Sequence, residues 1–225
     1  MSIEEQQVEN RRPLKVRDVG LVTQFARWLS QKSITPNHIS LLSIVFAVFA
    51  AAGFIATLYT DGFAKFSSFI LAALFIQGRL LCNLFDGLVA VEGGKSTPSG
   101  ELFNDIPDRI SDPLIIIAAG YSVVCVSYGD VLGWCGALLA VLTAYVRTLA
   151  VSIHAPANFM GPMAKQHRMA LLTFACIATA IEQIWFEHDY AMVIALVILN
   201  IGTLITVWCR TAIAYRYLEN GMGEK

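Results

Sequence analysis

The sequence predicts an all-α polytopic membrane protein with about six transmembrane helices and an N-terminal amphipathic helix at the membrane interface. Of the 225 residues, 56% are hydrophobic and only 15% are charged. The mean hydropathy of +0.60 lies above the usual range of soluble domains. Several apolar runs also approach the roughly 20 residues that a helix needs to cross a bilayer. A membrane is therefore the expected solvent.

The apolar runs define six candidate spans. Their ranges are 37–59, 66–90, 113–128, 131–153, 169–185 and 190–215. The third and fifth are short for a hydrocarbon layer of about 30 Å. Because the loops are brief, we expect one membrane domain over 37–217, with a cytoplasmic N-terminal segment over 1–36 and a cytoplasmic tail over 218–225.

The segment 18–31, ahead of the first span, has an amphipathic pattern. Leu21, Phe25 and Trp28 recur at helical spacing, while Arg27 falls on another face. This pattern favours a helix lying in the cytoplasmic interface of the membrane. A soluble helix packed against the bundle is the alternative.

Basic residues gather on one side of the predicted membrane, and such residues mark the cytoplasmic side. They are Arg11, Arg12, Lys15, Arg17, Arg27, Lys32, Lys95, Arg109, Lys165, Arg168, Arg210, Arg216 and Lys225. The opposite loops are mainly acidic, with Lys65 as their one base. We therefore expect an integral protein of a bacterial inner membrane with both termini in the cytoplasm. No signal-peptide pattern opens the chain, so the first span is expected to insert uncleaved.

Carboxylates and amides interrupt the second span and precede the third. Asn83, Asp86 and Gly87 lie at i, i+3 and i+4 and so share one helix face. Asn104 and Asp108 repeat at i+4 on the other side of a glycine-rich loop. Carboxylates at membrane depth are costly and indicate function by default. Oxygen ligands of this kind suit a hard cation such as Mg²⁺.

A purely structural interpretation of the acidic residues is also open. Asp105 or Asp112 could form an ion pair with Arg109 along the third helix. The five cysteines are odd in number and lack C-x-x-C spacing, and the four histidines are scattered. Neither residue type predicts a zinc site.

The segment from Asn83 to Asp108 resembles the signature of the CDP-alcohol phosphatidyltransferase family, D-x2-D-G-x2-A-R-x8-G-x3-D-x3-D. Every spacing is kept. However, Asn83 and Asn104 stand in place of acids, and Val91 in place of the arginine. The resemblance implies a six-helix membrane transferase of phospholipid biosynthesis. Such an enzyme moves a phosphoalcohol group from a CDP-linked lipid, usually CDP-diacylglycerol, to an alcohol and releases CMP.

The resemblance also assigns roles to residues at matching positions. Asp108 would be the base that takes the proton of the acceptor hydroxyl, and Mg²⁺ or Mn²⁺ would be the cofactor, as one or two ions. The expected metal ligands at signature positions are Asp86, Asn83, Asn104 and Asp108, and Asp105, outside the signature, is expected to compensate for Asn104. The expected CDP-binding residues at signature positions are Asp86, Gly87, Ala90 and Gly100, and Lys95, outside the signature, is expected to compensate for the missing arginine. Because amides carry no charge, one tightly held ion is favoured over two.

Basic residues near the fourth and fifth spans suggest the acceptor site. Arg147, Lys165 and Arg168 are expected to hold the phosphate of an acceptor such as glycerol phosphate or inositol phosphate, or of a lipid. Snorkelling of these side chains to the interface is the alternative. Arg79, in the second span, is interpreted as a snorkelling or pairing residue.

Two other functions remain open at this stage. The chain could be a family relative that binds nucleotide or lipid without turnover, which the two asparagines motivate. A small transporter with intramembrane carboxylates is the third class, although the sequence lacks obvious inverted halves. We expect membrane lipids and no nucleic acid among the partners, and the family resemblance is compatible with a homodimer.

Overall fold

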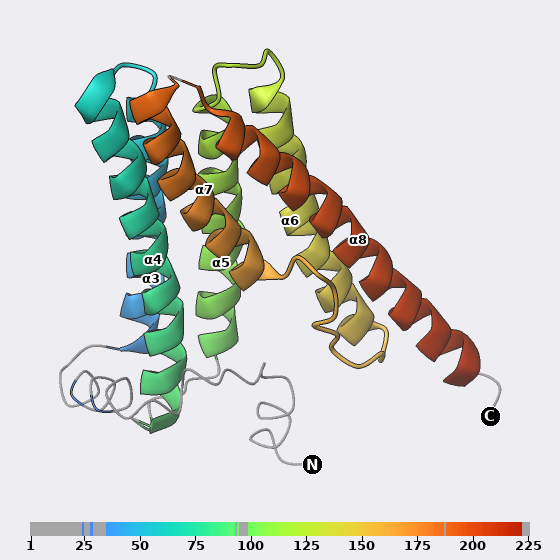
Figure 1. Cartoon of the computed structure of the whole chain (residues 1–225). Helices are drawn as coiled ribbons and strands as arrows, with labels where there is room; N and C mark the ends of the chain where they lie inside the picture. Colours follow the sequence, from blue (N-terminus) through green and yellow to red (C-terminus); the bar gives the residue numbers. More distant parts are fainter. Residues whose placement is uncertain are drawn as a thin grey trace.

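The computed structural model describes residues 24, 28, 35–92, 94, 99–186 and 188–221. Over these residues the chain is a bundle of long helices without strands (Figure 1). The long helices are α3 (Pro36–Ala56), α4 (Gly62–Glu92), α5 (Gly100–Tyr121), α6 (Gly129–Ser152), α7 (Lys165–Trp185) and α8 (Tyr190–Gly221). The predicted all-α class is confirmed. The predicted interfacial helix over 18–31 lies outside the described residues, apart from Gln24 and Trp28.

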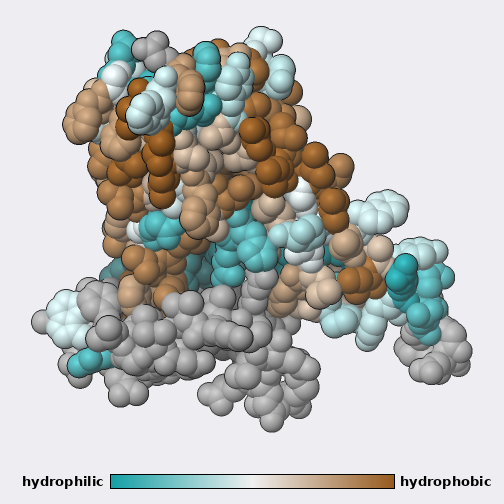
Figure 2. Space-filling model, viewed as in Figure 1, coloured by the Kyte–Doolittle hydropathy of each residue, from teal (hydrophilic) through white to brown (hydrophobic). Residues whose placement is uncertain are grey.

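Five of the six long helices, α3, α4, α6, α7 and α8, are long and apolar enough to cross a membrane. Figure 2 shows apolar side chains over the middle of the visible face and polar ones towards its upper end. The sixth helix, α5, runs beside the others, but its first half carries several charged residues. The chain is therefore a polytopic membrane protein, in which α5 is the polar helix of the bundle.

The predicted third span, 113–128, was wrong in its bounds. The helix begins at Gly100 and ends at Tyr121, with Pro107 and Pro113 inside it. The hydropathy bounds left out the acidic first half because charged residues lower the local average, although Asn104 and Asp108 were expected one helical turn apart at the start of this helix. In the fold these charges are paired with residues of neighbouring helices, so the helix can enter the bundle with them.

The predicted fifth span, 169–185, began one turn too late. Helix α7 starts at Lys165, so Lys165 and Arg168 are helical and lie at its N-terminal end. Both side chains therefore project from a fixed element and not from a loop, which matters for the site described below.

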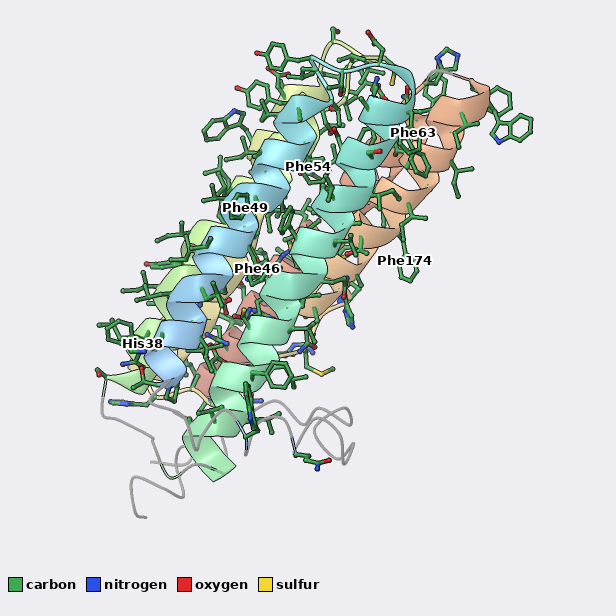
Figure 3. All side chains as sticks on the ribbon, turned by 90° about the vertical axis from the view of Figure 1, so that its left-hand side faces the viewer. His38, Phe46, Phe49, Phe54, Phe63 and Phe174 are labelled. Carbon is green, nitrogen blue, oxygen red and sulfur yellow. The ribbon has the colours of Figure 1, made fainter. Side chains whose placement is uncertain are left out.

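Aromatic and small residues set the spacing between helices. Figure 3 shows Phe46, Phe49 and Phe54 along α3, facing α4. The ring centroids of Phe49 and Phe75 are 5.2 Å apart. Where α5 crosses α6, a Cβ added to Gly120 would lie 2.6 Å from the Cα of Gly133, so no larger residue fits there without a shift of the backbone.

Helix α3 packs on α4 and α5, α5 on α6, α4 on α7 and α6 on α8. With this arrangement, the last turns of α4 and α6 and the first turns of α3 and α5 lie at one end of the bundle (Figure 1). At the opposite end, buried Asp189 accepts the backbone N–H of Val124 at 3.2 Å and lies 3.6 Å from the Lys65 ammonium. The contacts of Asp189 therefore lie at the end of the bundle away from the polar residues of the signature.

Candidate functional site

Charged side chains from α4, α5 and α7 meet inside the bundle near the start of α7. We call this set the charged cluster, and it consists of Arg79, Asp86, Asp108, Asp112, Lys165 and Arg168. All of these except Lys165 are less than a tenth exposed. Burying a charge inside a membrane bundle costs several kcal/mol unless a partner compensates it. The partner of each group therefore decides what that group can do.

Asp108 is surrounded by hydrogen-bond donors. Its Oδ1 accepts from Arg79 Nη2 at 2.9 Å and from Asn83 Nδ2 at 3.0 Å, and its Oδ2 pairs with the Lys165 ammonium. Arg79 and Asn83 are four residues apart on α4, so they reach Asp108 from one helix face. Both oxygens of the predicted base are thus engaged, and of its two charged partners Lys165 is the one with a partly exposed side chain, at 28%.

Asp86 has a different environment from Asp108. Its Oδ2 accepts a hydrogen bond of 2.7 Å from the Ser40 hydroxyl of α3, and it interacts electrostatically with Asp108 and Lys165. Among the described residues Asp86 forms no ion pair, although it is only 5% exposed. The structure thus brings the two signature carboxylates together, as the sequence predicts.

Asp112 extends the cluster one helical turn beyond Asp108. Arg79 Nη2 lies 2.6 Å from one of its oxygens, and Arg168 Nη2 donates to the other at 2.9 Å. Arg168 also donates to the carbonyl of Met163 at 3.0 Å. Because Arg168 is only 4% exposed, its role is to hold Asp112 and the start of α7, and it is not placed to receive a phosphate.

Asp105 lies outside the charged cluster. It pairs with Arg109 at 3.1 Å and with Arg147 at 3.0 Å, and its side chain is 43% exposed. The Arg147 guanidinium also lies 5.4 Å from the centre of the Phe159 ring. Asp105 therefore follows the structural alternative of ion pairing, and the metal-ligand prediction for it is not supported.

The remaining predicted residues lie around the charged cluster. Asn104 is exposed, one turn before Asp108 on α5, while Gly87, Ala90 and Gly100 are half-buried near the adjoining ends of α4 and α5. Lys95, predicted to bind CDP, lies outside the described residues.

Two functional candidates escaped sequence reasoning. Ser40 gave no signal, because its contact with Asp86 joins residues 46 positions apart. Arg79 was expected to snorkel or to pair. It is fully buried, so pairing is correct and snorkelling is wrong. The weak signal was its spacing, one turn before Asn83 on the same face of α4.

The donor set fits one divalent cation. Asp86, a buried carboxylate without an ion pair among the described residues, interacts electrostatically with Asp108, and the amides of Asn83 and Asn104 could add neutral oxygens. No group of three or more acidic, histidine or cysteine side chains in the described residues is arranged to hold a metal. Two carboxylates that already face Arg79 and Lys165 do not supply the charge for two dications.

Comparisons with known proteins agree with this fold. A sequence model of the CDP-alcohol phosphatidyltransferase family matches residues 33–208. The phosphatidylinositol phosphate synthase of Mycobacterium tuberculosis, crystallised with manganese and citrate, is 16% identical with a TM-score of 0.71, and the match covers 86% of this chain and 88% of that one. The same synthase with CDP-DAG bound is 16% identical with a TM-score of 0.71, over 87% of this chain and 94% of that one. No curated protein sequence matched the chain.

Proposed function

The chain belongs to the CDP-alcohol phosphatidyltransferase family, and from this premise we propose that it transfers a phosphoalcohol group from a CDP-linked lipid to an alcohol acceptor and releases CMP. The observation that carries the proposal is the meeting of Asp86 and Asp108 inside the bundle, at the signature spacing. A CDP-lipid donor is supported by the CDP-DAG found in the structural neighbour.

In the proposed reaction the acceptor oxygen attacks the phosphorus that carries the lipid, and the bond from that phosphorus to the oxygen of CMP breaks. Asp108 takes the proton of the attacking hydroxyl. Its Oδ2 can do so only after Lys165 has moved away, because the ammonium now pairs with that oxygen. Arg79 and Asn83 stay on Oδ1 and keep the carboxylate oriented.

We propose Mg²⁺ or Mn²⁺ as the cofactor, held as one ion by Asp86 and Asp108 with Asn83 and Asn104. The bound ion would neutralise the donor pyrophosphate and so stabilise CMP as the leaving group. Ser40 would keep Asp86 oriented through its 2.7 Å hydrogen bond. The manganese with which the structural neighbour was crystallised supports a divalent ion as the cofactor.

For the acceptor we propose a phosphorylated alcohol bound by Arg147 and Lys165. Both side chains are about a quarter exposed and already face a carboxylate, so a phosphate can replace that partner. Arg168 is left out because its guanidinium is buried against Asp112. Since α3 begins and α8 ends at the end of the bundle where the basic residues lie, we place this end in the cytoplasm of a bacterial cell.

The occupied state of Asp108 favours a second candidate function. Arg79, Asn83 and Lys165 together engage both carboxylate oxygens, so neither oxygen is free to accept a proton while Lys165 stays in place. A relative that binds CDP-lipid or nucleotide without turnover would need no base at all. The two functions differ in whether substrate binding displaces Lys165 from Asp108.

Release of CMP distinguishes the two functions. Purified protein in lipid nanodiscs is given CDP-diacylglycerol, Mg²⁺ or Mn²⁺ and a panel of free and phosphorylated alcohols. We expect release with at least one acceptor, and a loss of at least about a hundredfold in both D86N and D108N. D130N is the matched control, since Asp130 is exposed at the opposite end of the bundle and its release should match wild type. CDP binding without release under every condition would instead establish the non-catalytic relative.

A further inference from the structure

We propose that Arg79 is a resident cation that restricts this centre to a single divalent ion, an inference that rests on the proposed function. One guanidinium nitrogen, Nη2, lies 2.9 Å from Asp108 and 2.6 Å from Asp112. Arg79 therefore places a permanent positive charge directly against one of the two carboxylates that would bind metal.

Arg79 differs from Lys165 in how firmly it is held. Its side chain has no exposed surface, whereas that of Lys165 is 28% exposed. Lys165 is the first residue of α7, and its side chain can turn towards water or phosphate. Arg79 has no such path, because its side chain is fully buried in a helix, α4, that packs against both α3 and α7.

The remaining guanidinium nitrogens show that charge, and not a full set of hydrogen bonds, holds Arg79. Within the described residues, its Nε and Nη1 are buried without a hydrogen-bond partner. Burial of an arginine at membrane depth is then offset mainly by the carboxylates of Asp108 and Asp112. The guanidinium would have to leave both carboxylates to make room for a second metal ion, and no other group in the described part of the chain compensates its charge.

The charges of the centre follow from these contacts. Asp112 is balanced by Arg168, its second partner. Asp86 and Asp108 carry two negative charges against Arg79 and Lys165, so the resting centre is neutral. Once Lys165 leaves, one negative charge remains uncompensated beside Arg79. That charge attracts one dication, while a second would meet both the first ion and the guanidinium.

The size of this effect is large enough to measure. A dication a few ångström from a guanidinium is repelled by several kcal/mol at an effective dielectric constant of about 20, and relaxation and salt reduce this to a smaller net term. We expect removal of the Arg79 charge to tighten the binding of a divalent ion by at least about tenfold.

The experiment measures Mn²⁺ binding by electron paramagnetic resonance, without nucleotide or lipid donor, on the full chain in nanodiscs. The test variant is R79Q/D112N, which removes one positive and one negative charge and so keeps the net charge. The matched control is R168Q/D112N, which makes the same change on the far side of Asp112 and leaves Arg79 on Asp108. R79M/D112L repeats the test with apolar side chains, which replace buried ion pairs without loss of stability in many proteins.

The proposal predicts at most one Mn²⁺ per wild-type chain, tighter binding in R79Q/D112N or R79M/D112L, and wild-type affinity in R168Q/D112N. Affinity within about twofold of wild type in the folded Arg79 variants overturns it, as do two tight ions in wild type or equal tightening in the control. Absence of Mn²⁺ binding in all variants also overturns it. CMP release by wild type, measured in parallel, tests the proposed function separately.

Discussion

The charged residues of this bundle are explained by their partners. Asp108 and Asp112 share Arg79, Asp112 is completed by Arg168, and Asp108 by Lys165. Such pairs compensate the desolvation of each charge but add little net stability. Asp86, with a hydroxyl partner and no ion pair among the described residues, is the exception. A buried carboxylate without an ion-pair partner is a candidate ligand-binding group.

The role proposed for Arg147 gives a second prediction at the scale of a single residue. Replacing Arg147 by alanine would remove the proposed charge-assisted contact to the acceptor phosphate, and a hydrogen bond of this kind contributes about 1.5–3 kcal/mol. We expect the KM for the phosphorylated acceptor to rise about ten- to a hundredfold, with little change for CDP-diacylglycerol. R109A is the matched control, because Arg109 shares Asp105 but lies on α5. Steady-state kinetics with varied acceptor measure the effect, and an unchanged acceptor KM in R147A would remove this residue from the site.

Helix α5 determines the shape of the site, because it carries Asp108 and Asp112 on the face that meets α4 and α7. Its position depends on the close crossing with α6, where Gly120 and Gly133 touch. This crossing lies towards the end opposite the signature residues. It therefore fixes α5 without taking part in the chemistry.

A valine at position 120 tests this role of the crossing. The added side chain would lie within 3 Å of the α6 backbone, and such overpacking costs about 1–3 kcal/mol. We expect G120V to lower the thermal unfolding temperature in detergent, while V141I, at an exposed position of α6, leaves it unchanged. Equal unfolding temperatures for G120V and wild type would show that α5 and α6 are held elsewhere.

The positions of α3, α6 and α8 could be predicted from the sequence, because each of these helices contains a long run of apolar residues. The start of α5 was not, because hydropathy averages cannot foresee that Arg79 and Arg168 compensate Asp112 across helices. The proximity of Asp86 and Asp108 could be predicted from the signature spacing. The contact of Ser40 with Asp86 could not, since it depends on the packing of α3.

At the scale of the whole molecule, the two ends of the bundle differ in their polar contacts. At one end Asp189, which precedes α8, contacts Val124 in the loop after α5 and Lys65 of α4. The charged cluster lies towards the other end, where α3 begins and α8 ends. Under the proposed function, the lipid chains of the donor would lie in the membrane and its CDP group would lie at the charged cluster.

A structure of the protein with CDP-diacylglycerol and Mn²⁺, with the metal located by its anomalous scattering, tests the central claim most directly. The account predicts one manganese peak that contacts Asp86 and Asp108, the donor pyrophosphate beside it, Lys165 turned away from Asp108, and Arg79 still in place. Manganese and pyrophosphate bound at a site that excludes either carboxylate would contradict it.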